Sequence, residues 1–157
     1  LRISSDDRIP FTMSLGYRSD TPPSDPHAPI RLTASLDRTA VREGSLVNLN
    51  ATITNTTQFP QGMTMAILGI PAGCEPRVDR LREMRDQGRF AFFELRNREV
   101  ILYFTQMDPN EMKQLSIELI AAIPGRYTAP ASQAYLYYRD SSRHWVDPVA
   151  IDIAAEE

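Results

Sequence analysis

The chain has 157 residues, of which 42% are hydrophobic and 24% charged, so it can bury the core of one globular domain. This composition excludes wholesale disorder and a collagen-like structure. A formal net charge of −3 argues against binding to nucleic-acid phosphates, and the apolar runs are far shorter than the roughly 20 residues of a membrane-spanning helix. We therefore expect no nucleic-acid partner and no membrane contact by this chain.

The N-terminal part differs in composition from the rest. Residues 1–18 include one strand-like run, at 11–17, and the following segment 19–29 holds four prolines and no apolar run. Such a segment is typical of an extended linker. We expect a terminal strand at 1–18, a linker at 19–29 and a main domain at 30–157. Because the chain starts at Leu1 and shows no leader pattern, we expect a piece of a longer protein.

Strands are predicted wherever apolar residues alternate with polar ones. The best run has Val47, Leu49, Ala51 and Ile53 on one face, with asparagines and threonines between them. Similar runs, separated by turn residues, lie at 11–17, 30–36, 63–70, 90–95, 100–104, 115–123, 134–138 and 149–153. This spacing predicts an all-β fold, an antiparallel β-sandwich of immunoglobulin-like type. Its predicted core residues are Leu49, Ile53, Ile67, Leu102, Leu119 and Ile151.

One segment predicts a helix, at about 76–87. Pro76 suits a first turn, Val78, Leu81 and Met84 form an apolar stripe, and Gly88 supplies a stop. This gives one amphipathic helix of about three turns lying on the sandwich.

The predicted helix is strongly basic within an acidic chain. Its arginines are Arg77, Arg80, Arg82, Arg85 and Arg89. One interpretation is a solvated face on which Asp79, Glu83 and Asp86 offset the arginines. The other is a face that binds another protein or another domain.

No catalytic, cofactor or metal site is predicted. The chain has two histidines, His27 in the proline-rich segment and His144 beside Trp145, and one cysteine, Cys74. Three scattered residues do not supply the ligands of a zinc site, and a catalytic triad needs a nucleophile beside a base that a third group orients. We expect His144 to be a surface residue that packs its ring beside Trp145.

The second half of the chain resembles the C-terminal receptor-binding domain of the α2-macroglobulin family. The resemblance rests on the order of the helix, the strand at 99–103, the tyrosine-rich strand at 134–138 and a closing strand. The segments 123–125, 127–132 and 143–146 are similar to bacterial members. The run at 11–17 before a proline-rich spacer is similar to the last strand of the preceding CUB-like domain.

This resemblance implies part of a protease trap and not an enzyme. In the family, a protease cleaves an exposed bait region and the large molecule rearranges around it; many members have a C-x-E-Q thioester. Cys74 is followed by Glu75, Pro76 and Arg77, so it departs from that motif. In vertebrate members two lysines on the helix bind a receptor, and because this helix has none, receptor binding is not carried over.

The resemblance also implies the partners and the location. The partners would be the thioester and CUB-like domains of the parent protein and, through the parent, the target proteases. The location would be periplasmic, secreted or at the cell surface. An alternative is a free-standing immunoglobulin-like adhesion or carbohydrate-binding module that stacks ligands on Tyr135, Tyr137, Tyr138 and Trp145. A hydrolase is a third possibility.

Overall fold

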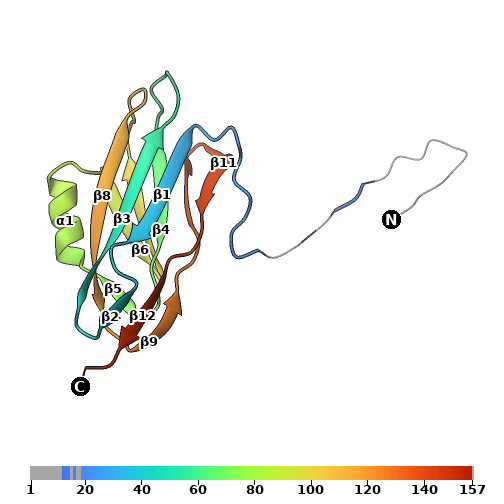
Figure 1. Ribbon diagram of the computed structural model, residues 1–157. Coiled ribbons are helices and arrows are strands. Elements are labelled where there is room, and N and C mark those ends of the chain that lie inside the picture. Colours follow the sequence, from blue (N-terminus) through green and yellow to red (C-terminus); the bar gives the residue numbers. More distant parts are fainter. Residues whose placement is uncertain (1–11, 15, 17–18, 157) are drawn as a thin grey trace, which may run out of the picture.

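The protein is a β-sandwich with one helix against its side (Figure 1). This is a computed structural model, which describes residues 12–14, 16 and 19–156. It confirms the predicted fold class. The elements, in chain order, are β1 Ile30–Leu36, β2 Ala40–Arg42, β3 Leu46–Asn55, β4 Thr64–Gly69, β5 Cys74–Pro76, α1 Val78–Asp86, β6 Phe92–Arg96, β7 Glu99–Phe104, β8 Met112–Ala121, β9 Gly125–Thr128, β10 Ser132–Leu136, β11 Arg139–Val146 and β12 Ala150–Ala154.

Two large antiparallel sheets face each other. One has the strand order β1-β3-β8-β5 and the other β11-β10-β4-β7-β6. A small third sheet, β2-β12-β9, contains the parallel pair β2 and β12. In β3 the burial of successive residues alternates as the sequence predicts, since side chains of a strand point to opposite faces.

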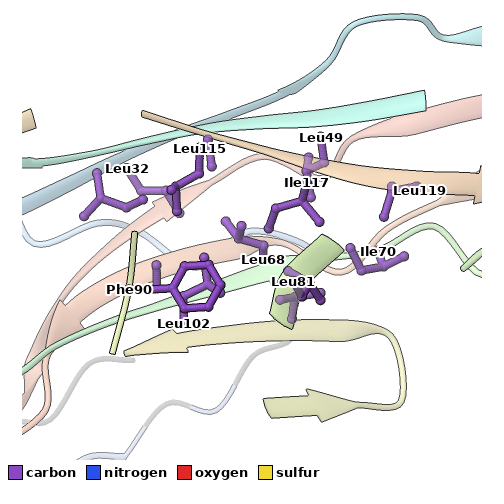
Figure 2. Packing of buried hydrophobic residues seen from close by; sticks show 14 of the residues in the cluster. Leu32, Leu49, Leu68, Ile70, Leu81, Phe90, Leu102, Leu115, Ile117 and Leu119 are labelled. Atoms are coloured by element: carbon purple, nitrogen blue, oxygen red, sulfur yellow. The ribbon is translucent and has the colours of Figure 1, made fainter. Parts of the chain in front are cut away.

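The core fills the space between the two large sheets. Figure 2 shows leucines and isoleucines of both sheets meeting there, together with Leu81 of α1 and Phe90. The structure confirms five predicted core residues, which are at most 3% exposed: Leu49, Ile53, Leu102, Leu119 and Ile151.

The sixth predicted core residue is buried, but in another place. Ile67 belongs to a second cluster with Met65, Ile101 and Tyr135, against which Tyr103 packs. These side chains alternate along β4 and β7 with the core residues, so they lie on the outer face of the five-stranded sheet. Ile67 is therefore buried as predicted, but on the outer face of the sheet and not between the two sheets, because β4 is apolar at positions that face both ways.

Several strands differ from the predictions. Four strands were not predicted: β2, β5, β9 and β11. The tyrosine-rich strand ends at Leu136, so Tyr137 and Tyr138 lie outside β10, in the connection to β11. Of the strand predicted at 11–17, residues 12–14 and 16 are not in a strand, and residues 11, 15 and 17 lie outside the described residues.

The segment before β1 is fastened to β11. The Asp25 backbone N–H donates to the Arg143 carbonyl oxygen at 2.9 Å, and the Ser142 hydroxyl donates to the Asp25 carboxylate at 2.6 Å. The Trp145 N–H donates to Ser24 Oγ at 2.8 Å. Residues 24–29, which we call the strap, therefore lie against the sandwich, with Ala28 and Pro29 buried. The boundaries predicted at residues 18 and 30 stay predictions.

Helix α1, with nine residues, is too short to span a lipid bilayer, and the part of the chain that the structure describes holds no other candidate.

Candidate functional site

Helix α1 forms where the sequence predicts it and is closed by a glycine. Arg77 is the N-cap, and Asp79 in the first turn and Arg85 in the last turn suit the helix dipole. Gly88 has a positive φ of 74°, and the N–H groups of Gly88 and Arg89 donate to the carbonyl oxygens of Arg85 and Met84. This is a Schellman motif, which turns the chain back toward β6. Leu81 and Met84 attach the helix to the core.

Three of the five predicted arginines lie in α1, while Arg77 caps its start and Arg89 follows its end. Most are paired with local carboxylates. Arg77 contacts Asp79 at 2.5 Å and Glu118 of β8 at 2.9 Å, and Arg80 contacts Glu83 at 2.7 Å. The hydrogen bond from Arg77 holds the pKa of Asp79 below its ordinary value. Exposed pairs of this kind are screened by solvent, so they offset charge more than they stabilise the fold.

The end of the helix is less well balanced. Arg85 contacts Asp86 at 2.8 Å, but Arg89 donates to the Gln114 carbonyl oxygen. Within the described part of the chain, neither Arg82 nor Arg89 has a carboxylate oxygen within 4.0 Å. That these arginines bind a partner stays a prediction.

A hollow of about 270 Å³ lies beside the end of α1, between the helix and β8. We call it the basic hollow, because Arg85, Arg89 and Lys113 line it together with Phe104. Lys113 is the only lysine of the chain, and its ammonium lies 5.9 Å from the centre of the Phe104 ring and 2.6 Å from a Glu111 oxygen. No local sequence pattern connects Lys113 with the helix, because it lies 24 positions after Arg89.

A second hollow of about 380 Å³ adjoins the first. We call it the aromatic hollow, because Phe92, Tyr103, Tyr137 and Tyr138 line it, with Glu94 beside them. Its aromatic rings pair as Phe92 with Tyr103 and as Tyr137 with Tyr138. Phe92 and Tyr103 were not predicted as site residues. The signal that could have pointed to them is a phenylalanine, Phe92, on the edge strand β6.

The structure does not bring together the four residues predicted as a stacking platform for an adhesion module. Tyr135 is buried on the outer face of the sheet, where the Arg143 guanidinium lies 4.4 Å from its ring centre. Trp145 lies on β11 and is held by the strap. Only Tyr137 and Tyr138 contribute to the aromatic hollow.

His144 has a structural role different from the predicted one. It is half-buried, and its Nδ1 accepts a hydrogen bond of 3.3 Å from the Leu32 backbone N–H. Burial and the nearby Arg31 lower its pKa. His144 and Trp145 are neighbours in β11, so their side chains point to opposite faces of the strand.

The other candidate chemical groups are dispersed. Cys74 is buried, and burial raises the pKa of its thiol, which makes the reactive thiolate scarcer. Over residues 12–14, 16 and 19–156, no three histidine, cysteine or carboxylate side chains come together in a way that could hold a metal ion.

Comparison with known proteins assigns the family. A family model of the bacterial alpha-2-macroglobulin MG10 domain matches residues 19–140. The chain belongs to this family. The resemblance seen in the sequence is confirmed, and the matched MG10 region includes the strap. No curated protein matches the chain by sequence.

Solved structures support the MG10 fold. The chain is similar to trypsin-activated alpha-2-macroglobulin from Escherichia coli, with 14% identity and a TM-score of 0.67 over 84% of this chain and 11% of that chain. Salmonella alpha-2-macroglobulin reacted with methylamine is 18% identical, with a TM-score of 0.67, over 88% of this chain and 10% of that chain. Native Escherichia coli alpha-2-macroglobulin from domain MG7 to the C-terminus is 15% identical, with a TM-score of 0.64, over 85% of this chain and 25% of that chain. The chain thus spans between a tenth and a quarter of these larger chains.

Proposed function

We propose that the chain is the C-terminal MG10 module of a bacterial alpha-2-macroglobulin-like endopeptidase inhibitor. It acts as a non-enzymatic packing module, which contacts the thioester and CUB-like domains of the parent protein and moves when a protease cuts the bait region. The parent works outside the cytoplasm, in the periplasm or at the cell surface. Target proteases meet the parent and not this module alone.

The observation that carries this proposal is the apolar outer face of the five-stranded sheet. Met65, Ile67, Ile101 and Tyr135 form a cluster there, outside the sandwich core. Near it, Phe92 is 53% exposed and Tyr138 is 86% exposed. The cluster residues are themselves at most 8% exposed, and it is the exposed aromatic side chains beside them that are typical of a contact with another protein domain. The family match supports a neighbour within one long chain.

The test uses the longer protein that carries this chain. It is incubated with trypsin, with and without methylamine pretreatment, and examined by gel and mass spectrometry. We expect a covalent adduct with trypsin that methylamine abolishes. Cleavage without an adduct, together with full trypsin activity on large substrates, would remove the protease-trap proposal.

The packing role needs a second readout on the same protein. Hydrogen exchange is measured over β4 and β7 before and after bait cleavage. We expect slower exchange in the native parent than in the isolated chain, since a neighbouring domain covers the outer face, and a change upon cleavage. Equal exchange in all three states would show that the outer face does not contact the parent.

A further inference from the structure

The basic hollow and the aromatic hollow adjoin where β6 begins and β7 ends. Three residues line both: Ala91, Phe104 and Thr105. Ala91 and Thr105 are exposed. A bound chain that crosses Ala91 and Thr105 has both hollows within reach, one on each side of this edge of the sheet.

The basic hollow carries excess positive charge in a chain that is acidic overall. Arg85, Arg89 and Lys113 face two local carboxylates, Asp86 and Glu111. Arg89 is the cation left over, and its guanidinium keeps donors beyond the one that the Gln114 carbonyl oxygen accepts. A carboxylate is the group that an arginine fork binds best.

The aromatic hollow offers ring faces and little free charge. The Tyr103 hydroxyl donates to one Glu94 oxygen at 2.8 Å, and Arg96 donates to the other at 2.7 Å. These two hydrogen bonds also hold the pKa of Glu94 below its ordinary value, so the carboxylate stays ionised and paired. The rings of Phe92, Tyr137 and Tyr138 are left to contact a ligand, and they favour an aromatic or branched aliphatic side chain.

We propose that the two hollows are a docking surface for an acidic segment of a protein partner, with an apolar side chain in the aromatic hollow and a nearby carboxylate in the basic hollow. Charge complementarity at Arg89 selects an acidic occupant. A neutral glycan fits the aromatic rings but leaves the Arg89 guanidinium without a carboxylate. One part of this proposal rests on the proposed function, namely that the partner is a protein domain.

The test is an NMR titration of the chain itself, labelled with ¹⁵N, with three short capped peptides. The first is Gly-Phe-Gly-Glu-Glu-Gly, the second replaces both glutamates by lysine, and the third replaces phenylalanine by serine. We expect saturable shifts of the Gly88, Ala91 and Thr105 amides with the first peptide, and binding weaker by about tenfold or more with the other two. Added salt should weaken the first interaction.

Exposed residues supply variants that keep the fold. Arg89→Glu and Tyr138→Ser should each weaken the first peptide by about tenfold or more. Arg126→Glu, at a residue whose side chain is 88% exposed and lies outside both hollows, is the matched control and should leave the affinity within about twofold.

Three results would overturn the proposal. They are no saturable shift at about 10 mM of the first peptide, equal binding of all three peptides, and a neutral oligosaccharide that shifts the same amides regardless of the Arg89→Glu change. Each concerns this surface alone, so the trypsin and methylamine experiment on the parent protein can succeed or fail independently.

Discussion

The two large sheets of the sandwich have very different outer faces. In the four-stranded sheet, β3 alternates between buried aliphatic residues and polar residues such as Asn50 and Thr52. In the five-stranded sheet, every residue of β4 is buried. Alternation indicates a strand with one face in water, whereas a continuous apolar run indicates a strand whose two faces are both covered.

The difference supports the proposal that a neighbouring domain contacts the five-stranded sheet. Among the described residues, the outer apolar cluster is covered by side chains of the same sheet. Tyr103 packs against the cluster, and the Arg143 guanidinium lies over the Tyr135 ring. A sheet that faced only water would not need Met65, Ile67 and Ile101 there. The five-stranded sheet is therefore the side of the sandwich that suits contact with other domains.

The largest expected effect is at the inner face of β7. Leu102 is fully buried between the sheets, so Leu102→Ala should lower the free energy of unfolding by about 2 to 5 kcal/mol. Urea unfolding followed by circular dichroism measures this loss. An unchanged urea midpoint would remove Leu102 from the core.

A smaller effect is expected one residue earlier, on the opposite face. Ile101 is 3% exposed, but its surroundings are a thin cluster that can relax. Ile101→Ala should cost about 2 kcal/mol, the low end for such a change. The same urea experiment compares the two variants directly. If Ile101→Ala costs as much as Leu102→Ala, the two faces are equally well packed in the isolated chain.

The next expected effect is a pH dependence of stability that arises from His144 of β11, which is hydrogen-bonded to Leu32 of β1. The folded protein lowers the pKa of His144, so protonation favours the unfolded state. In the unfolded chain the pKa of His144 is about 6.5, and the neutral side chain stabilises the fold above that pH. This stabilisation should be lost as the pH falls below 6.5 and through the lower pKa of His144 in the folded protein. His144→Gln should remove this dependence.

The measurement is the unfolding free energy of both proteins between about pH 7.5 and 5.5. His27→Gln, at an exposed residue, serves as the control for changing a histidine. A constant difference between the native protein and His144→Gln across this range would contradict the assignment.

The smallest effect is expected on the polar outer face of β3. Asn50 is exposed, so Asn50→Ala should change the unfolding free energy by no more than about 0.5 kcal/mol. A shift in the thermal midpoint shows this sensitively. A clear loss of stability would mean that the four-stranded sheet is covered as well, and the contrast between the sheets would disappear.

The sequence predicts the parts of this fold whose pattern is local. The alternation in β3 and the stripe of Leu81 and Met84 with Gly88 after it are set by periodicity and turn chemistry, and the structure confirms them. The strand β11 escapes such a prediction, because Arg139–Val146 is a polar edge strand without alternation. The sequence predicts the burial of Ile67 but not the face on which it lies, since an unbroken apolar run does not say which residue points inward.

The candidate site was predictable in its charge but not in its shape. The cluster of arginines is visible in the chain, yet its pairing with Glu118 and its neighbour Lys113 depend on β8 lying beside α1. The aromatic hollow joins Phe92 to Tyr137, residues 45 positions apart, through the order of strands in the sheet. Neither proximity has a local signal in the sequence.

The strap determines how mechanical load enters this domain. A pull on the chain ahead of Ser24 reaches the hydrogen bonds of Ser24 and Asp25 with β11 before it reaches the ladder of β1. Because several bonds share that load, the strand pairing inside the sandwich is spared until they break. The pairing of β1 with β3 is therefore loaded only after these hydrogen bonds have broken.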